Sequence, residues 1–260
     1  MAVLLPVASK QATSAVQEPG GTVPGMTTTT TSPTPVRRAS APARRGAVTS
    51  LTDHALLHRA LRSGTRVVAD ALTGIAFDEP CCPVRQRELV RWTTRVLAEV
   101  RAHAALRRGL EAALSRVVLP GGCPDLRRAG GDAALDSALA RARQALPLFA
   151  RDASAGAPAL ALALTGLADL VAARLDAEED GVLPLVDEHV PAAERDRVVR
   201  AARRSLPAGQ SLFTLPWLLD ACHPAERVTV LRTASRPARR VLRHAGARHA
   251  RTRDAVLGLT

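Results

Sequence analysis

Four stretches of the chain carry apolar residues at the three- and four-residue spacing of an amphipathic helix, and breaks rich in glycine and proline separate them. A helix with one apolar stripe must bury that stripe against other elements, so four such helices in succession favour an antiparallel four-helix bundle. We predict that the helices span residues 50–74, 84–118, 133–150 and 160–189. No stretch shows the alternation of a strand, and the expected fold class is therefore all-α.

The ends of these stretches carry residues that begin and end helices. Asp53 offers a side-chain oxygen that can cap the first helix. Pro120 and the glycines after it end the second helix, and the segment 155–158, which contains glycine and proline, separates the third helix from the fourth. Pro184 is expected to bend the fourth helix. Residues 50–190 are thus predicted to form one helical domain.

The composition agrees with a helical core. Hydrophobic residues make up 47% of the chain but aromatic residues only 2%, so the core must be built mainly from leucine, valine and alanine. Alanine and leucine are among the strongest helix formers. The longest apolar stretch is interrupted by Pro158, Asp169 and Arg174, so no window reaches the apolar length that a membrane-spanning helix needs. We therefore expect a soluble protein with no membrane partner.

Two further regions flank the predicted domain. Residues 1–48 are rich in threonine, proline, serine and alanine and show no helical period, so we expect them to be disordered. Trp217 lies among leucines beyond the domain, and this apolar cluster is expected to be buried as a lid. The region that contains it is predicted to be a helical extension over 191–260, in pieces at 191–206, 211–221 and 223–235 and an arginine-rich last helix.

The chain is strongly basic, with a formal net charge of +12. Much of the excess lies at the two ends, because the stretch from Arg227 to Arg253 holds nine arginines and no acid. Such a surface is compatible with a binder of nucleic acid or of acidic partners. Basic ends are more often simply solvated, so nucleic-acid binding is not the favoured prediction.

The four cysteines do not have the spacing of a zinc site. Cys81 and Cys82 are adjacent and cannot easily form a disulfide with each other, and a chain of this size does not need a disulfide scaffold. The apolar start at residues 1–6 is too short for a signal peptide and lacks a basic segment. These features favour a cytoplasmic location.

Three short strings share the order and helical placement of motifs in a known family. The first predicted helix carries His58 within the string DHALLHRALR, and the fourth carries Glu178 and Glu179 within LDAEEDGVLPL. The string LPWLL follows at 215–219. Together these strings resemble the hemerythrin, or HHE cation-binding, family over roughly residues 50–225. The resemblance implies a four-helix bundle in which histidines and carboxylates from all four helices hold two irons.

The ligand set that the resemblance implies is incomplete in this chain. Arg107 stands four residues after His103, where the family has an acid. No histidine occurs between His103 and His189, so the third helix has none. Arg174 stands five residues before Glu179, where the family has a histidine. The ligands that remain are His58, His103 and Glu179, with Glu178 as a substitute.

Two functions are compatible with this set. Arginine keeps its charge when buried, so an arginine paired with Glu179 would replace the metal by an internal ion pair. The favoured prediction is therefore a non-enzymatic scaffold or interaction module with a protein partner and no cofactor. The alternative is a metal sensor or oxidative-stress protein that keeps one iron or zinc at His58, His103 and Glu179. His54, one turn before His58, could add a fourth ligand.

The resemblance implies a convergence of side chains that would distinguish these functions. His58, His103 and Glu179 should point to the axis of the bundle at a similar depth, and Arg107 or Arg174 should lie near one of the two adjacent glutamates. The sequence shows no Ser/His/Asp triad, phosphate-binding loop or paired catalytic carboxylates, so an enzyme is not expected.

Overall fold

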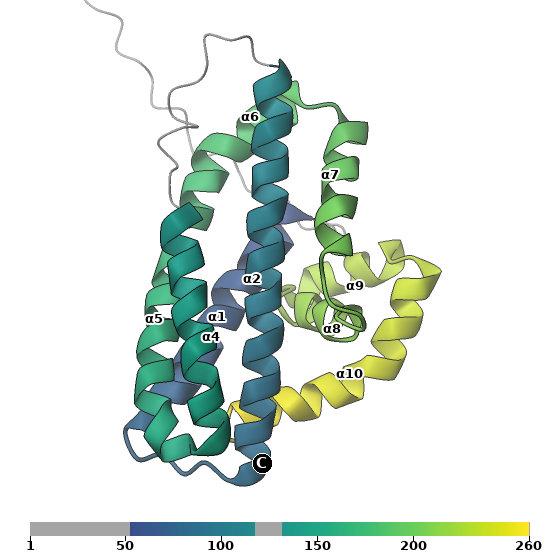
Figure 1. Ribbon diagram of the computed structural model, residues 1–260. Coiled ribbons are helices and arrows are strands. Elements are labelled where there is room, and N and C mark those ends of the chain that lie inside the picture. The colour runs from purple at the N-terminus through teal and green to yellow at the C-terminus, as the bar shows by residue number, and fades with distance from the viewer. Residues whose placement is uncertain (1–52, 118–131, 260) are drawn as a thin grey trace, which may run out of the picture. The chain divides into compact units, whose positions relative to one another are not determined.

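The computed structural model describes residues 53–117 and 132–259, and these residues form helices and no β-strand (Figure 1). The all-α prediction is confirmed. The predicted disorder at 1–48 and the loop after the second helix lie outside the described residues. The elements are α1 (His54–Ala76), α2 (Pro83–Val117), α4 (Asp132–Arg151), α5 (Ala153–Ala177), a π-helical turn η1 (Glu178–Val182), α6 (Leu183–His189), α7 (Ala192–Arg204), α8 (Ser211–Asp220), α9 (Pro224–Thr233) and α10 (Arg236–Val256).

The start of α5 differs from the prediction. The break between α4 and α5 lies at Asp152, not at 155–158, and Pro158 lies inside α5. Asp152 caps the helix, because its carboxylate accepts a hydrogen bond from the backbone N–H of Ala155 at 3.0 Å. Pro158 lies in the second turn of α5, where its missing N–H removes the hydrogen bond to the carbonyl of Ser154. In the same way Asp53 caps α1 by accepting from the N–H of Ala55.

The predicted fourth helix is interrupted by η1. Pro184 has no N–H for the carbonyl four residues before it, and its ring would clash with that carbonyl in a regular α-helix. A π-helical turn directly before the proline widens the backbone and removes this conflict. The consequence is that Glu178 and Glu179 lie where the helical geometry changes, so their side-chain directions do not follow the regular α-helical spacing.

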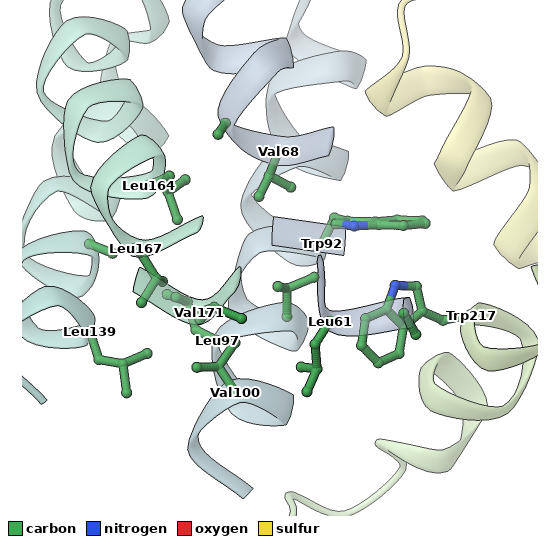
Figure 2. Close-up of a cluster of buried hydrophobic side chains, with 14 of the residues drawn as sticks. Leu61, Val68, Trp92, Leu97, Val100, Leu139, Leu164, Leu167, Val171 and Trp217 are labelled. Atoms are coloured by element: carbon green, nitrogen blue, oxygen red, sulfur yellow. The ribbon is translucent and has the colours of Figure 1, made fainter. Parts of the chain in front are cut away.

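The helices pack around a core that is mostly leucine, valine and alanine. α5 packs against α1 and α4, and α2 packs against α1 and α4. Figure 2 shows leucine and valine side chains from these helices converging, with Trp92 and Trp217 at one side. A second apolar cluster, which includes Leu110, Val186 and Val198, lies between α2, α6 and α7.

The C-terminal helices pack on the side of α2 away from α4 and α5 (Figure 1). Trp217 on α8 is only 4% exposed, which confirms the predicted burial of this cluster. Its indole lies so close to Gly64 that a Cβ at this glycine would be 2.8 Å from the ring. Gly64 therefore allows α8 to approach α1 closely.

In contrast to the sequence prediction, the continuous helical stretch Ala153–His189 is long and apolar enough, by length and composition alone, to cross a membrane, with a mean hydropathy of 1.6 in its most apolar window. Half of that window is buried inside the structure. Its buried residues pack against α1 and α4, as expected of a core helix.

Candidate metal centre

Polar residues recur at one-turn spacing on the inward faces of three helices. One-turn spacing places side chains above one another on one face of a helix. These residues lie between the two apolar clusters, because α2 contributes to the first up to Ala104 and to the second from Leu106. The members are His58 and Arg62 on α1, His103 and Arg107 on α2, and Arg174 and Glu178 at the end of α5 and the start of η1.

His58, His103 and Glu178 converge in this layer. The Nε2 atoms of the two histidines lie 3.0 Å apart. Oε2 of Glu178 lies 3.7 Å from Nε2 of His58 and 3.4 Å from Nε2 of His103. The three residues are 1%, 8% and 3% exposed, in that order. Three potential ligand atoms from three helical elements therefore share one buried point.

The spacing of these atoms suits a single metal ion. A four-coordinate ion with bonds of about 2.0–2.1 Å places neighbouring ligand atoms about 3.4 Å apart. The observed separations of 3.0, 3.4 and 3.7 Å bracket that value. Two imidazoles and one carboxylate form a ligand set that iron(II) and zinc both accept.

Glu179 has a different place from the one predicted. Its Oε1 lies 2.9 Å from Nδ1 of His58 and accepts from Arg62 at 2.8 Å. The structure thus brings Glu178, and not Glu179, to the ring nitrogens that face each other. Arg62 and His58 hold the pKa of Glu179 below its usual value, although burial opposes them. An ionised Glu179 accepts a hydrogen bond from the Nδ1–H group of His58. The lone pair of the neutral ring then lies on Nε2.

Burial sets the charge of the converging residues. Loss of solvation lowers the pKa of His58 to about 4 and that of His103 well below its ordinary value. Both imidazoles are therefore neutral near pH 7, which is the form that binds metals. Loss of solvation raises the pKa of Glu178 to about 7, although Arg107 and Arg174 oppose the rise.

The two arginines at positions where the resemblance implies ligands contact the far oxygen of Glu178. Oε1 of Glu178 lies 3.4 Å from Nε of Arg107 and 3.6 Å from Nε of Arg174. Arg107 also donates to Glu111 at 2.7 Å. The predicted approach of a guanidinium to this glutamate pair is thus observed. The arginines lie on the Oε1 side and the histidines on the Oε2 side, so the carboxylate separates the two groups.

This arrangement does not fit a pair of irons. Arg107 and Arg174 bring fixed positive charges to the places where the resemblance expects an acid and a histidine. Within the described residues, His58, His103 and Glu178 are the one group of potential ligands that lie close enough together to hold an ion.

The remaining histidines lie apart from this group. His54 lines a cavity of about 70 Å³ that also borders His103 and Glu99. Nε2 of His54 is buried and has no hydrogen-bond partner among the described residues. His249 is buried, and its Nε2 donates to Oδ2 of Asp220 at 3.1 Å, in a packing role. His189, His223 and His244 lie at or near the surface.

Sequence reasoning did not find two features of the centre. The first is the choice of Glu178 over Glu179, which depends on the π-helical turn; the only signal for that turn is Pro184. The second is Arg62, which fixes Glu179 and hence His58. Comparisons with protein-family models, with curated proteins and with solved structures found no match for the chain.

Proposed function

We propose that the chain is a hemerythrin-like four-helix protein that binds one iron(II) or zinc ion through His58, His103 and Glu178. The contacts of α1 with α5, of α5 with α4, of α4 with α2 and of α2 with α1 support the bundle part of this proposal. The observation that carries the metal proposal is that ligand atoms of these three residues lie within 4.8 Å of one another, all buried.

The hydrogen bonding around the histidines supports this proposal. Nδ1 of His58 donates to Glu179, so Nε2 of His58 keeps a lone pair that an ion could use. The 3.0 Å contact places a proton on Nε2 of His103, and an ion bound there would require this proton to move to Nδ1 or to be released. A pair of neutral buried imidazoles beside a buried carboxyl group stabilises a core less well than apolar residues of the same size. Such a cluster is more easily explained by a ligand than by packing.

A bound ion would act mainly as a cross-link. It would hold α1, α2 and η1 to one another, and a ligand that binds only the folded state stabilises that state. We therefore favour a non-enzymatic metal-binding or metal-sensing module, with a folded state that is strengthened by the ion.

A metal-free scaffold is the second candidate. It is supported by the ion pairs of Glu178 with Arg107 and Arg174, which give the buried carboxylate charged neighbours without any metal. In this case the polar layer would serve only to fix how the helices pack.

Titration with Co²⁺, followed by its visible absorption, separates the two candidates. Wild-type protein should bind one Co²⁺, and His103→Ala and Glu178→Gln should each weaken the binding by tenfold or more. Glu179→Gln should weaken it by about 10–100-fold, the usual effect of removing the partner that orients a ligand histidine. Absence of Co²⁺ binding by the wild type would support the scaffold instead.

Two control variants are matched to these substitutions. Glu99→Gln changes a second buried glutamate, which lies on α2 and accepts from Gln210 at 2.7 Å and also from Thr214. His249→Ala removes another buried histidine with a carboxylate partner. Both variants should bind Co²⁺ as the wild type does, and a loss as large as that of His103→Ala would contradict the assignment.

A further inference from the structure

A groove on the C-terminal helices is surrounded by arginines, and we call it the arginine groove. It has a volume of about 890 Å³ and lies between α8, α9 and α10. Leu219, Leu231 and Leu242 supply apolar lining from all three helices. The basic members are Arg236, Arg239, Arg240 and Arg243, which fall on one face of α10 because they are three, four and seven residues from the first.

The charge of this groove is not neutralised within residues 53–117 and 132–259. All four arginines are exposed, and none has an ion pair in those ranges. The acids of the neighbouring helices already have partners: Glu226 binds Arg59 at 2.7 Å, Asp220 binds His249 at 3.1 Å, and Asp254 binds Arg253 at 3.1 Å. The groove therefore presents a concentrated positive charge to a partner.

The leucines distinguish between classes of anionic partner. A nucleic-acid backbone gains nothing from an apolar lining, and the groove has no aromatic residue on which a base could stack. A bilayer surface cannot enter a concave groove. A helix with leucines on one face and acids on its flanks matches both the leucine lining of the groove and the arginines around it. Other helix-in-groove complexes use the same kind of match.

We propose that the arginine groove binds an acidic amphipathic helix of a partner protein. The N-terminal residues 1–50 of the chain itself are unsuitable, because they carry Lys10 and four arginines against the single acid Glu18. The arginine groove is independent of the metal centre, since none of its residues is His58, His103 or Glu178. The arginines steer and orient the partner helix, and the leucines bury its apolar face.

The test uses a synthetic helical peptide with leucines at positions i, i+3, i+4 and i+7 and glutamates on both flanks. Its affinity for the full-length protein, measured by fluorescence anisotropy, should exceed that of a scrambled peptide of the same composition by tenfold or more. Raising salt from 50 to 300 mM should weaken the binding of both peptides, because part of the attraction is between charges. Arg239→Glu/Arg243→Glu should weaken the binding of the patterned peptide at least tenfold.

The control is Arg200→Glu/Arg204→Glu, which reverses two exposed arginines at the same four-residue spacing on α7. It should leave the binding within twofold of the wild type. Leu242→Ala, in a protein with unchanged helicity by circular dichroism, should remove most of the preference for the patterned peptide. Equal binding of the two peptides, equal loss in both double variants, or tighter binding of duplex DNA or phosphatidylserine vesicles would overturn the proposal.

Discussion

At the scale of single residues, the metal centre depends on two adjacent glutamates with different environments. Burial raises the pKa of Glu178 to about 7, whereas Arg62 and His58 together hold the pKa of Glu179 below its ordinary value. The same local sequence thus supplies one carboxyl group that faces the histidine nitrogens and one that fixes the orientation of His58. The second role supports the first, because it leaves the lone pair of His58 directed at the proposed ion.

These environments predict how the stability of the metal-free protein depends on pH. His58 and His103 have lowered pKa values, so their contribution is present above the ordinary value of 6.5 and is lost as the pH falls. The pKa of Glu178 is raised, so its contribution is present below 4.5 and is lost as the pH rises towards 7. The stability lost at the two histidines as the pH falls exceeds the stability gained at the one carboxyl group. The free energy of unfolding should therefore decrease as the pH falls from 6.5 to 4.5.

Glu178→Gln removes the opposing contribution. The fall between pH 6.5 and 4.5 should become steeper, by up to about 1.4 kcal/mol per pH unit, which is the effect of one proton. Urea unfolding in the presence of a chelator measures this slope. An unchanged or shallower slope in the variant would show that Glu178 does not take up a proton in the folded state over this range.

At the scale of elements, the sequence predicts most helices but not the interruptions within them. The ends of α1, α2 and α4 lie within a few residues of the prediction, because capping residues and glycine–proline breaks are local signals. The start of α5 was misplaced, since Asp152 caps the helix and Pro158 is tolerated inside it. The π-helical turn was missed, and with it the choice between Glu178 and Glu179, because that turn depends on how Pro184 is accommodated in three dimensions.

The contact between α4 and α5 can be tested with two glycines of the same helix. A Cβ on Gly156 would lie 2.3 Å from backbone atoms of Phe149, and backbone atoms cannot move aside easily. Gly156→Ala should therefore destabilise the protein, by about 1–3 kcal/mol as for other overpacked sites. A Cβ on Gly166 would meet no atom within 4 Å, so Gly166→Ala should stabilise the protein by up to about 1 kcal/mol through helix propensity. Chemical denaturation measures the change in the free energy of unfolding of each variant. Changes of the same sign in the two variants would contradict this packing.

At the scale of the whole described unit, the polar layer lies between two apolar clusters. One cluster includes Leu97 and Leu175, and the other includes Leu106 and Val182. Helical periodicity predicts which residues face inward, but it cannot show that His58, His103 and Glu178 meet, because they lie far apart in the sequence. That expectation came from the resemblance to the hemerythrin family, and it identified the two histidines and gave Glu178 only as a substitute.

The proposed binding of one metal ion by this layer is checked by the metal content of the protein. The protein is loaded with zinc, or with iron(II) under anaerobic conditions, and is then dialysed. Its metal content is measured by inductively coupled plasma mass spectrometry. A single ion in this layer predicts one ion per chain in the wild type and none in His58→Ala/His103→Ala. Two ions per chain, no ion in the wild type, or one ion retained by the double variant would contradict it.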